Sequence, residues 1–175
     1  QILYLLEGLT QEKQLDILEI GSGTGNLAET LLNNSQKTLN YMGMEVDDLL
    51  IDLSASIAEV VNSVAVYIQG DAVRPHILKE SNVIISDLPI GYYPNDEIAS
   101  RFKVAATGEH TYAHHLLMEQ SLKYLKKDGI AIFLAPTNLL TSPQSDLLKK
   151  WLSGYADIIA VITLPEAAFG NKHNM

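Results

Sequence analysis

The chain has 175 residues, of which 47% are hydrophobic and 19% are charged, and its formal net charge is −9. We expect one globular domain over residues 1–175, because this length supports a core of its own. The absence of cysteine excludes disulfide bonds and thiolate metal sites, and no apolar run approaches the ~20 residues that cross a membrane. We therefore expect a cytoplasmic protein that does not contact a membrane. The negative charge argues mildly against binding to a phosphate backbone.

Hydrophobic residues alternate between the period of a helix and that of a strand. In the first part of the chain they predict, in order, a helix over residues 3–9, a strand over 15–20, a helix over 26–32, a strand over 39–45 and a helix over 49–61. The strand over 15–20 and the helix over 26–32 are separated by a short turn with three glycines.

The second part of the chain continues the same pattern. It predicts strands over 64–69 and 83–86, a long polar connection, a helix over 112–126, a strand over 130–135, a helix over 142–152 and a strand over 158–164. We expect Ser142 to cap its helix and Pro143 to occupy the first helical position. Lys123, Lys126 and Lys127 are expected at a helix C-terminus, where positive charge is favourable.

Strands that alternate with helices form βαβ units, which give a parallel sheet with right-handed crossovers. The predicted fold class is therefore α/β, with a doubly wound, Rossmann-like, mostly parallel sheet and helices on both faces. Only about ten residues follow the strand over 158–164, and they contain no further strand. Because the chain also begins without Met, both ends suggest a fragment of a longer protein.

Residues 19–25, Glu-Ile-Gly-Ser-Gly-Thr-Gly, form the most informative turn. Glycine has no β-carbon, so such a turn adopts positive φ angles and lets a ligand approach the backbone. The helix that follows offers unpaired N–H groups and the positive end of its dipole. This arrangement predicts a site for a nucleotide-like cofactor.

Two kinds of cofactor fit this turn. Residues 23–28 match the dinucleotide pattern G-x-G-x-x-A, and Glu45 lies about 20 residues on, where a ribose-binding acid is expected. An NAD-dependent oxidoreductase is thus the weaker alternative. Glu19, directly before the glycines, would repel a diphosphate. It would favour a cofactor with a cationic end, such as S-adenosyl-L-methionine.

The run of residues 16–25, Asp-Ile-Leu-Glu-Ile-Gly-Ser-Gly-Thr-Gly, resembles the class I S-adenosylmethionine-dependent methyltransferases, and the likeness extends over nearly the whole chain. The resemblance implies a seven-stranded plan whose last strands lie outside this fragment. It also implies that Glu45 binds both ribose hydroxyls, that Asp71 accepts from the adenine amino group and that the N–H of Ala72 meets the ring. The cofactor-binding residues so implied are Glu19, Gly21, Ser22, Gly23, Thr24, Gly25, Glu45, Val46, Asp71, Ala72 and Asp87.

The segment 87–94, Asp-Leu-Pro-Ile-Gly-Tyr-Tyr-Pro, resembles the [Asn/Asp/Ser]-Pro-Pro-aromatic tetrad of amino-methyltransferases. An exocyclic amine on a ring is a poor nucleophile because its lone pair is delocalised. A side-chain oxygen and a backbone carbonyl can accept its two hydrogens and direct the lone pair at the methyl group. The resemblance implies that Asp87 and Leu88 supply these oxygens, and that Pro89 and Tyr92 complete the catalytic residues.

Ile90 stands where the tetrad has an aromatic residue that stacks on a flipped base, so either Tyr92 or Tyr93 would have to provide the platform. The same segment resembles a bacterial group of adenine-specific DNA methyltransferase-like proteins. This likeness implies transfer of a methyl group to an exocyclic amine, adenine N6 in nucleic acid, with DNA favoured over RNA as the substrate.

Other functions remain open at this point. The chain could be a catalytically silent scaffold that binds the cofactor, or a methyltransferase that acts on a protein or a small molecule. Arg101 and Lys103, in the long connection, could meet phosphate, although a solvated loop is the simpler interpretation. His110, His114 and His115 lack the spacing of zinc enzymes, so we expect no metal site.

Overall fold

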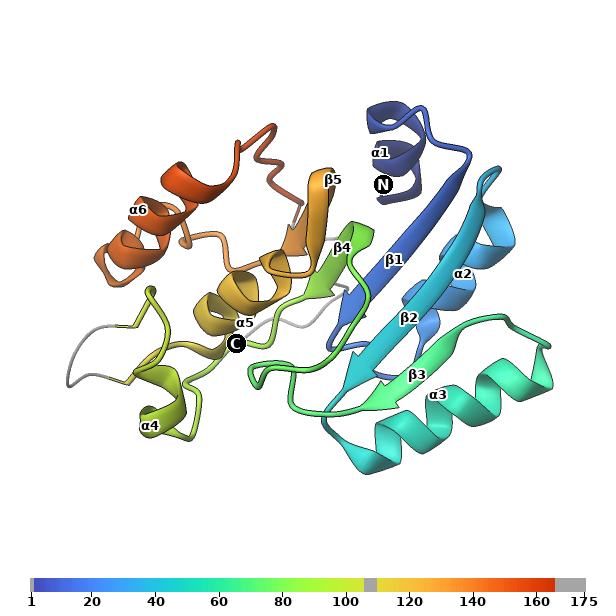
Figure 1. Ribbon diagram of the computed structural model, residues 1–175, viewed down its shortest axis with the longest axis horizontal. Coiled ribbons are helices and arrows are strands. Elements are labelled where there is room, and N and C mark those ends of the chain that lie inside the picture. Colours follow the sequence, from blue (N-terminus) through green and yellow to red (C-terminus); the bar gives the residue numbers. More distant parts are fainter. Residues whose placement is uncertain (1, 106–109, 166–175) are drawn as a thin grey trace.

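The computed structural model describes residues 2–105 and 110–165 and shows one five-stranded sheet between layers of helices (Figure 1). The strands run in the order β3-β2-β1-β4-β5, and every pairing is parallel. They are β1 (Gln14–Ile20), β2 (Thr38–Glu45), β3 (Val66–Gln69), β4 (Ser81–Asp87) and β5 (Leu125–Leu134). The predicted α/β fold class is confirmed.

Helices cover both faces of the sheet because successive side chains of a buried strand point to opposite faces. The helices are α1 (Ile2–Leu9), α2 (Asn26–Asn34), α3 (Asp48–Val60), α4 (Asp96–Ala99), α5 (Ala113–Leu122) and α6 (Asp146–Tyr155). Ile17 packs with Leu6 of α1 and Leu31 of α2, whereas Leu18 belongs to the cluster that contains Leu116 of α5 and Leu148 of α6.

The strand order has a functional consequence. The chain passes from β1 outward through β2 to β3 and then crosses to β4 on the other side of β1. Open α/β sheets bind ligands at such a switch point, beyond the carboxyl ends of the strands. All five strands are parallel, so the residues that follow them meet at this one edge.

The predicted helices before and after β5 are both present, but their ends differ from the prediction. The helix expected over 112–126 ends at Leu122, and Lys126 and Lys127 lie in β5 instead of at a helix end. Lys126 is held there by Asp16, whose Oδ2 lies 2.8 Å from its Nζ. The helix expected over 142–152 begins later, because Pro143–Ser145 form a short 3₁₀ turn and Ser142 makes no capping bond.

The prediction of a strand over residues 158–164 is wrong. These residues form neither a helix nor a strand in the part of the chain that the structure describes, and Ile159 is 70% exposed. A strand requires a neighbour with a free edge in the right register, and apolar composition cannot supply one. Within the described ranges no helix is long and apolar enough to cross a membrane.

Candidate functional site

The glycine turn lies between β1 and α2, at the switch point of the sheet. Gly21, Gly23 and Gly25 have φ angles of 71°, 54° and 79°, which other residues rarely adopt. The N–H groups of Gly21 and Ser22 both donate to the carbonyl of Met44, at 2.8 and 3.0 Å. The turn is thereby fastened to the carboxyl end of β2.

Gly25 is required by packing as well as by its φ angle. A β-carbon at this position would meet the hydroxyl of Tyr67, which comes from β3. At Gly23, by contrast, a β-carbon would meet nothing within 4 Å. Gly25 therefore has a structural reason to be glycine that the sequence did not reveal, and a ligand is not needed to explain it.

Three carboxylates gather around the turn, from the ends of β1, β2 and β4. Glu19 is 3% exposed, and its Oε2 accepts a hydrogen bond of 2.9 Å from the hydroxyl of Tyr41. Burial, opposed by this bond and reinforced by the negative charges of Asp87 and Glu45, raises the pKa of Glu19 to about 7. None of the ion pairs among the described residues involves these three carboxylates.

Glu45 connects β2 to the glycine turn. Its Oε2 accepts from the N–H of Gly23 at 2.9 Å, and its Oε1 accepts from the N–H groups of Val46 and Asp47 at 2.8 and 3.1 Å. A carboxylate has roughly four lone-pair positions, so about one remains. The expected grip on two ribose hydroxyls would therefore have to share one of these N–H bonds.

Asp71 follows β3 and faces the loop that follows β4. Its Oδ1 accepts from the N–H of Val73 at 3.0 Å, and its Oδ2 accepts from the hydroxyl of Tyr93 at 2.5 Å. Arg74 approaches the same Oδ2 at 3.4 Å. Ala72 is partly buried beside it. The contact with Tyr93, a residue outside the predicted cofactor set, was not foreseen.

The loop after β4 begins at Asp87, an exposed residue whose pKa is raised by partial burial of the carboxyl group. The side chain of Leu88 is buried, and its N–H donates to the carbonyl of Leu134 at 3.0 Å. Pro89 and Ile90 are exposed, Ile90 by 78%. Neither therefore packs into the core.

The two tyrosines of this loop point in different directions. Tyr93 turns inward and is 8% exposed, whereas Tyr92 is 58% exposed. Tyr92 pairs with Tyr112 in an antiparallel bridge, and their rings stack with centroids 4.5 Å apart. The stack continues to His114, whose ring centroid lies 5.1 Å from that of Tyr112. Tyr92 thus begins a row of aromatic rings that leads from the protein surface to the buried His114.

The histidines and the basic loop residues have mostly structural partners. Burial lowers the pKa of His114 and that of His115, the latter to about 4, so neither is charged at neutral pH. His110 lies 3.0 Å from Asp96, and Arg101 lies 3.0 Å from Glu97. No group of residues suited to hold a metal ion occurs in the described ranges.

Ser22 has a hydroxyl that is buried without a hydrogen-bond partner among the described residues. A buried polar group without a partner is costly, so it indicates a place where a water molecule or a ligand completes the structure. The hydroxyl lies within the predicted cofactor site, next to Gly43 of β2.

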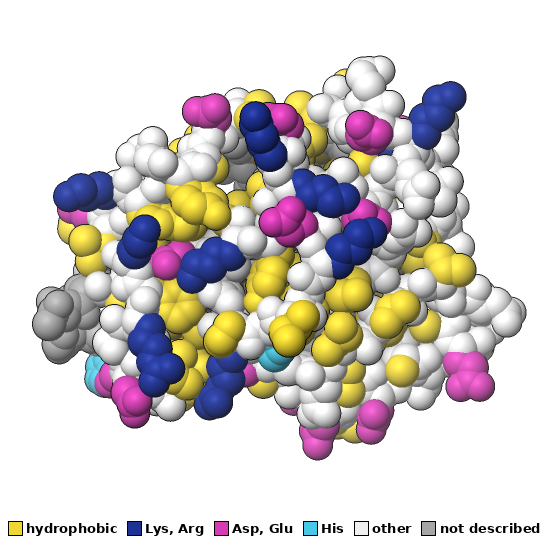
Figure 2. All heavy atoms as spheres, viewed as in Figure 1, with side chains coloured by type: hydrophobic (Ala, Val, Ile, Leu, Met, Phe, Trp, Pro, Cys, Tyr) yellow, Lys and Arg dark blue, Asp and Glu magenta, His cyan; other side chains and the backbone are white. Residues whose placement is uncertain are grey.

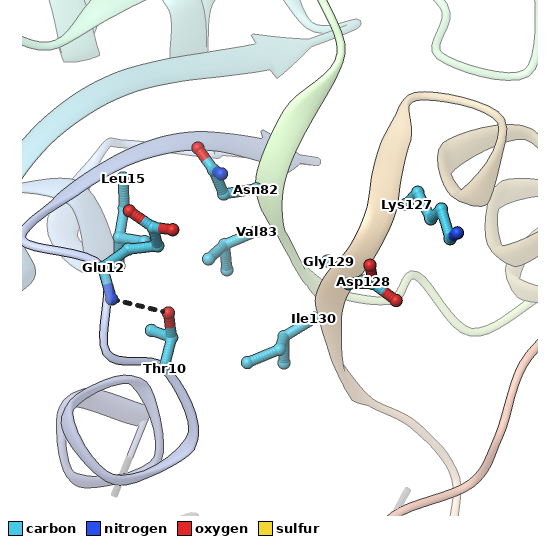
Figure 3. Close-up of a pocket in the computed structure, with 9 residues that line it drawn as sticks. All are labelled: Thr10, Glu12, Leu15, Asn82, Val83, Lys127, Asp128, Gly129 and Ile130. Carbon is cyan, nitrogen blue, oxygen red and sulfur yellow. Dashed lines mark hydrogen bonds between the residues drawn. The ribbon is translucent and has the colours of Figure 1, made fainter.

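A hollow of about 240 Å³ lies at the opposite end of the sheet (Figure 3). It is lined by residues that precede or begin β1, β4 and the paired part of β5, among them Glu12, Asn82 and Asp128. None of the predicted site residues lines it. It is therefore distinct from the carboxyl edge where the three carboxylates meet.

The chain is similar to proteins that are about twice as long. No protein-family model matches it. The uncharacterized protein YtxK of Bacillus subtilis is 38% identical over 160 residues, which are 91% of this chain and 49% of YtxK. The crystal structure of a candidate class I S-adenosylmethionine-dependent methyltransferase of Listeria monocytogenes is 32% identical, with a TM-score of 0.81 over 87% of this chain and 49% of that one.

More distant structures share the fold alone. Coclaurine N-methyltransferase, solved with N-methylheliamine and S-adenosylhomocysteine, is 14% identical, with a TM-score of 0.53 over 75% of this chain and 33% of that one. The chain shares its α/β fold with the candidate class I methyltransferase of Listeria and with coclaurine N-methyltransferase. It spans about half the length of the relatives that are most informative, YtxK and the Listeria protein.

Proposed function

We propose that this chain is the catalytic part of an S-adenosylmethionine-dependent methyltransferase that methylates an exocyclic amine, adenine N6 in nucleic acid. The observation that carries the proposal is the group of Glu19, Glu45 and Asp87. Three carboxylates at one edge of a sheet, without a basic partner among the described residues, favour a cationic ligand. A diphosphate would be repelled there.

The residues at this edge fit S-adenosyl-L-methionine, which carries an ammonium and a sulfonium group. Glu19 and the glycine turn would hold its amino-acid end, Glu45 its ribose and Asp71 its adenine amino group. The buried hydroxyl of Ser22 offers a further polar group in the same place. When bound, the cofactor supplies an electrophilic methyl group. The similarity to the Listeria structure supports this choice.

Asp87 and Leu88 would prepare the accepting amine. The carboxylate of Asp87 and the carbonyl of Leu88 each accept one of its hydrogens, which draws the lone pair out of conjugation. As the nitrogen displaced the sulfur of the cofactor from the methyl carbon, it would gain positive charge, which the carboxylate of Asp87 would stabilise. Asp87 then accepts the proton that the nitrogen releases.

A row of rings beside this loop supports a planar acceptor. Tyr92 and Tyr112 present a stacked pair at the surface, and a flipped base can stack on such a pair in place of the missing aromatic residue at Ile90. On the face seen in Figure 2, Lys and Arg side chains lie over the part of the molecule that carries α4 to α6 and over the centre, with acidic side chains among them. This distribution reduces the repulsion of a polyanion by an acidic chain.

The proposal is tested by incubating the complete protein with methyl-labelled cofactor and, separately, with DNA, RNA, protein and small amines. We expect label in the adenines of DNA. Label in protein or in small amines alone would refute the nucleic-acid substrate and retain the methyltransferase. Calorimetry with S-adenosylhomocysteine and NAD⁺ tests the cofactor, since an oxidoreductase would bind only NAD⁺. Cofactor binding without transfer to any acceptor would indicate a scaffold.

A further inference from the structure

Tyr93 joins the two parts of the candidate site. It belongs to the loop that begins at Asp87, and its hydroxyl donates a hydrogen bond of 2.5 Å to Oδ2 of Asp71. Asp71 follows β3 and lies two strands away from β1 on the far side from β4. The bond therefore connects the loop proposed to hold the acceptor with the residue proposed to bind the adenine of the cofactor.

The position of Tyr93 is set by the fold. Its N–H donates to the carbonyl of Thr111 at 2.9 Å, and its ring is part of the core cluster that contains Val73 and Leu88. Burial raises the pKa of Tyr93 to about 12, with the charge of Asp71 adding to the effect. The hydroxyl is therefore protonated at neutral pH and acts as a donor to the carboxylate.

The donors around Asp71 leave one position open. Tyr93 and Arg74 both approach Oδ2, and the N–H of Val73 occupies one lone pair of Oδ1. A carboxylate accepts about four hydrogen bonds, so one lone pair of Oδ1 remains for a further donor. Arg74 is mostly exposed, at 3.4 Å, and restrains the carboxylate only weakly. Tyr93 makes the shortest of the three bonds to the carboxylate, at 2.5 Å.

We propose that Tyr93 is a positioning residue, which orients Asp71 so that its free lone pair meets the amino group of the cofactor's adenine. The proposal rests on the proposed function. Recognition of the cofactor's adenine amino group would then depend on a residue of the loop that begins at Asp87, which is proposed to hold the methyl acceptor. One hydrogen bond would link the cofactor site to the site of the methyl acceptor.

The test compares two ligands in two variants of the complete protein. Calorimetry is performed with S-adenosylhomocysteine and with its analogue that carries hydrogen in place of the adenine amino group. In Tyr93→Phe we expect about tenfold weaker binding of S-adenosylhomocysteine, the scale of one hydrogen bond to a charged group. The analogue should change less than about twofold, because it makes no bond to Asp71.

Tyr155→Phe is the matched control, because it removes a hydroxyl whose one hydrogen bond among the described residues is to the carbonyl of Leu122, at 3.4 Å. It should leave both affinities unchanged. Equal losses for both ligands in Tyr93→Phe would show a merely structural role and refute the proposal, as would unchanged or tighter binding of S-adenosylhomocysteine. If the wild-type protein binds neither ligand, the proposed function itself fails, and the role of Tyr93 fails with it.

Discussion

Strand β1 carries an acidic residue near each end, and the two have opposite environments. Asp16, at the amino end, lies 2.8 Å from Lys126 and 3.1 Å from Lys79, and Asn40 donates to it at 2.8 Å. These partners hold the pKa of Asp16 well below its usual range. Glu19, at the carboxyl end, has a tyrosine as its partner, and its pKa is raised to about 7.

The difference shows that charged groups stabilise the fold at the amino end of the sheet and form the candidate site at its carboxyl end. At the amino end of the sheet the chain supplies its own cations, so the charge of Asp16 stabilises the fold. At the carboxyl end it buries a carboxylate and places Glu45 and Asp87 nearby, which costs stability. Carboxylates kept in such a state are typical of functional sites, because a ligand can supply the missing positive charge.

The largest expected effect is on methyl transfer and concerns Asp87, at the carboxyl end of β4. Asp87→Ala removes the oxygen that accepts an amine hydrogen, so we expect transfer to fall by about 10³-fold. Cofactor affinity should fall much less, by about tenfold at most, because Glu19 and Glu45 remain. Asp87→Asn retains an acceptor oxygen and should keep more activity. Single-turnover transfer and calorimetry measure the two quantities. A variant that transfers methyl at the wild-type rate would remove Asp87 from the mechanism.

Gly25 tests whether the carboxyl end is also constrained by packing. In Gly25→Ala the new β-carbon would be strained by the positive φ of 79° and would also clash with the hydroxyl of Tyr67. We expect a loss of about 3 kcal/mol in the free energy of unfolding. Gly23→Ala has the φ penalty alone and should lose about 1 kcal/mol. Denaturant unfolding measures both. Adding Tyr67→Phe to Gly25→Ala should recover part of the loss, and equal losses for the two glycines would contradict the packing argument.

Glu19 should couple cofactor binding to pH. A cationic ligand favours the ionised form, so affinity for S-adenosylmethionine should rise about tenfold from pH 6 to pH 8, through the raised pKa near 7. The ratio of the wild-type affinity to that of Glu19→Gln, measured at each pH, cancels the titration of the ligand's own amino group. This ratio should rise with pH for S-adenosylmethionine and for S-adenosylhomocysteine, because both carry the amino-acid end that Glu19 is proposed to hold. A ratio that does not change with pH would contradict the role of Glu19.

The same pKa shift has an opposite consequence for the ligand-free protein. The folded state holds the proton of Glu19 more tightly than the unfolded chain, whose value is 4.5. This contribution to stability is therefore full below pH 4.5 and is lost as the pH rises through about 7. Unfolding curves of the wild type and Glu19→Gln, compared at pH 5 and pH 8, separate this contribution from the rest.

The smallest effect is expected at the amino end of β1. Lys126→Met removes the main partner of Asp16, and we expect a loss of about 1 kcal/mol at pH 7, since the pair is partly exposed. The lowered pKa of Asp16 contributes stability above the unfolded value of 3.8, and this is lost as the pH falls below it. The variant should therefore lose less stability on acidification. Lys127→Met, an exposed neighbour, serves as the control in denaturant unfolding.

Much of the fold was predictable from local patterns. The strand, glycine turn and helix over residues 14–34 appear as expected. Hydrophobic periodicity and turn-forming glycines determine the local structure of segments only a few residues long, so the sequence reveals them directly. The grouping of Glu19, Glu45 and Asp87 was also predictable. Each follows or ends a strand, and parallel strands bring their carboxyl ends to one edge.

Only the tertiary structure decided the contacts between residues distant in sequence. These include the bond between Tyr93 and Asp71, the packing of Tyr67 against Gly25, and the pairing of β5, which contains Lys126, with β4. The failure of residues 158–164 to pair belongs here too. Local propensity describes what a segment can form, whereas pairing and side-chain contacts depend on which segments the fold brings beside it.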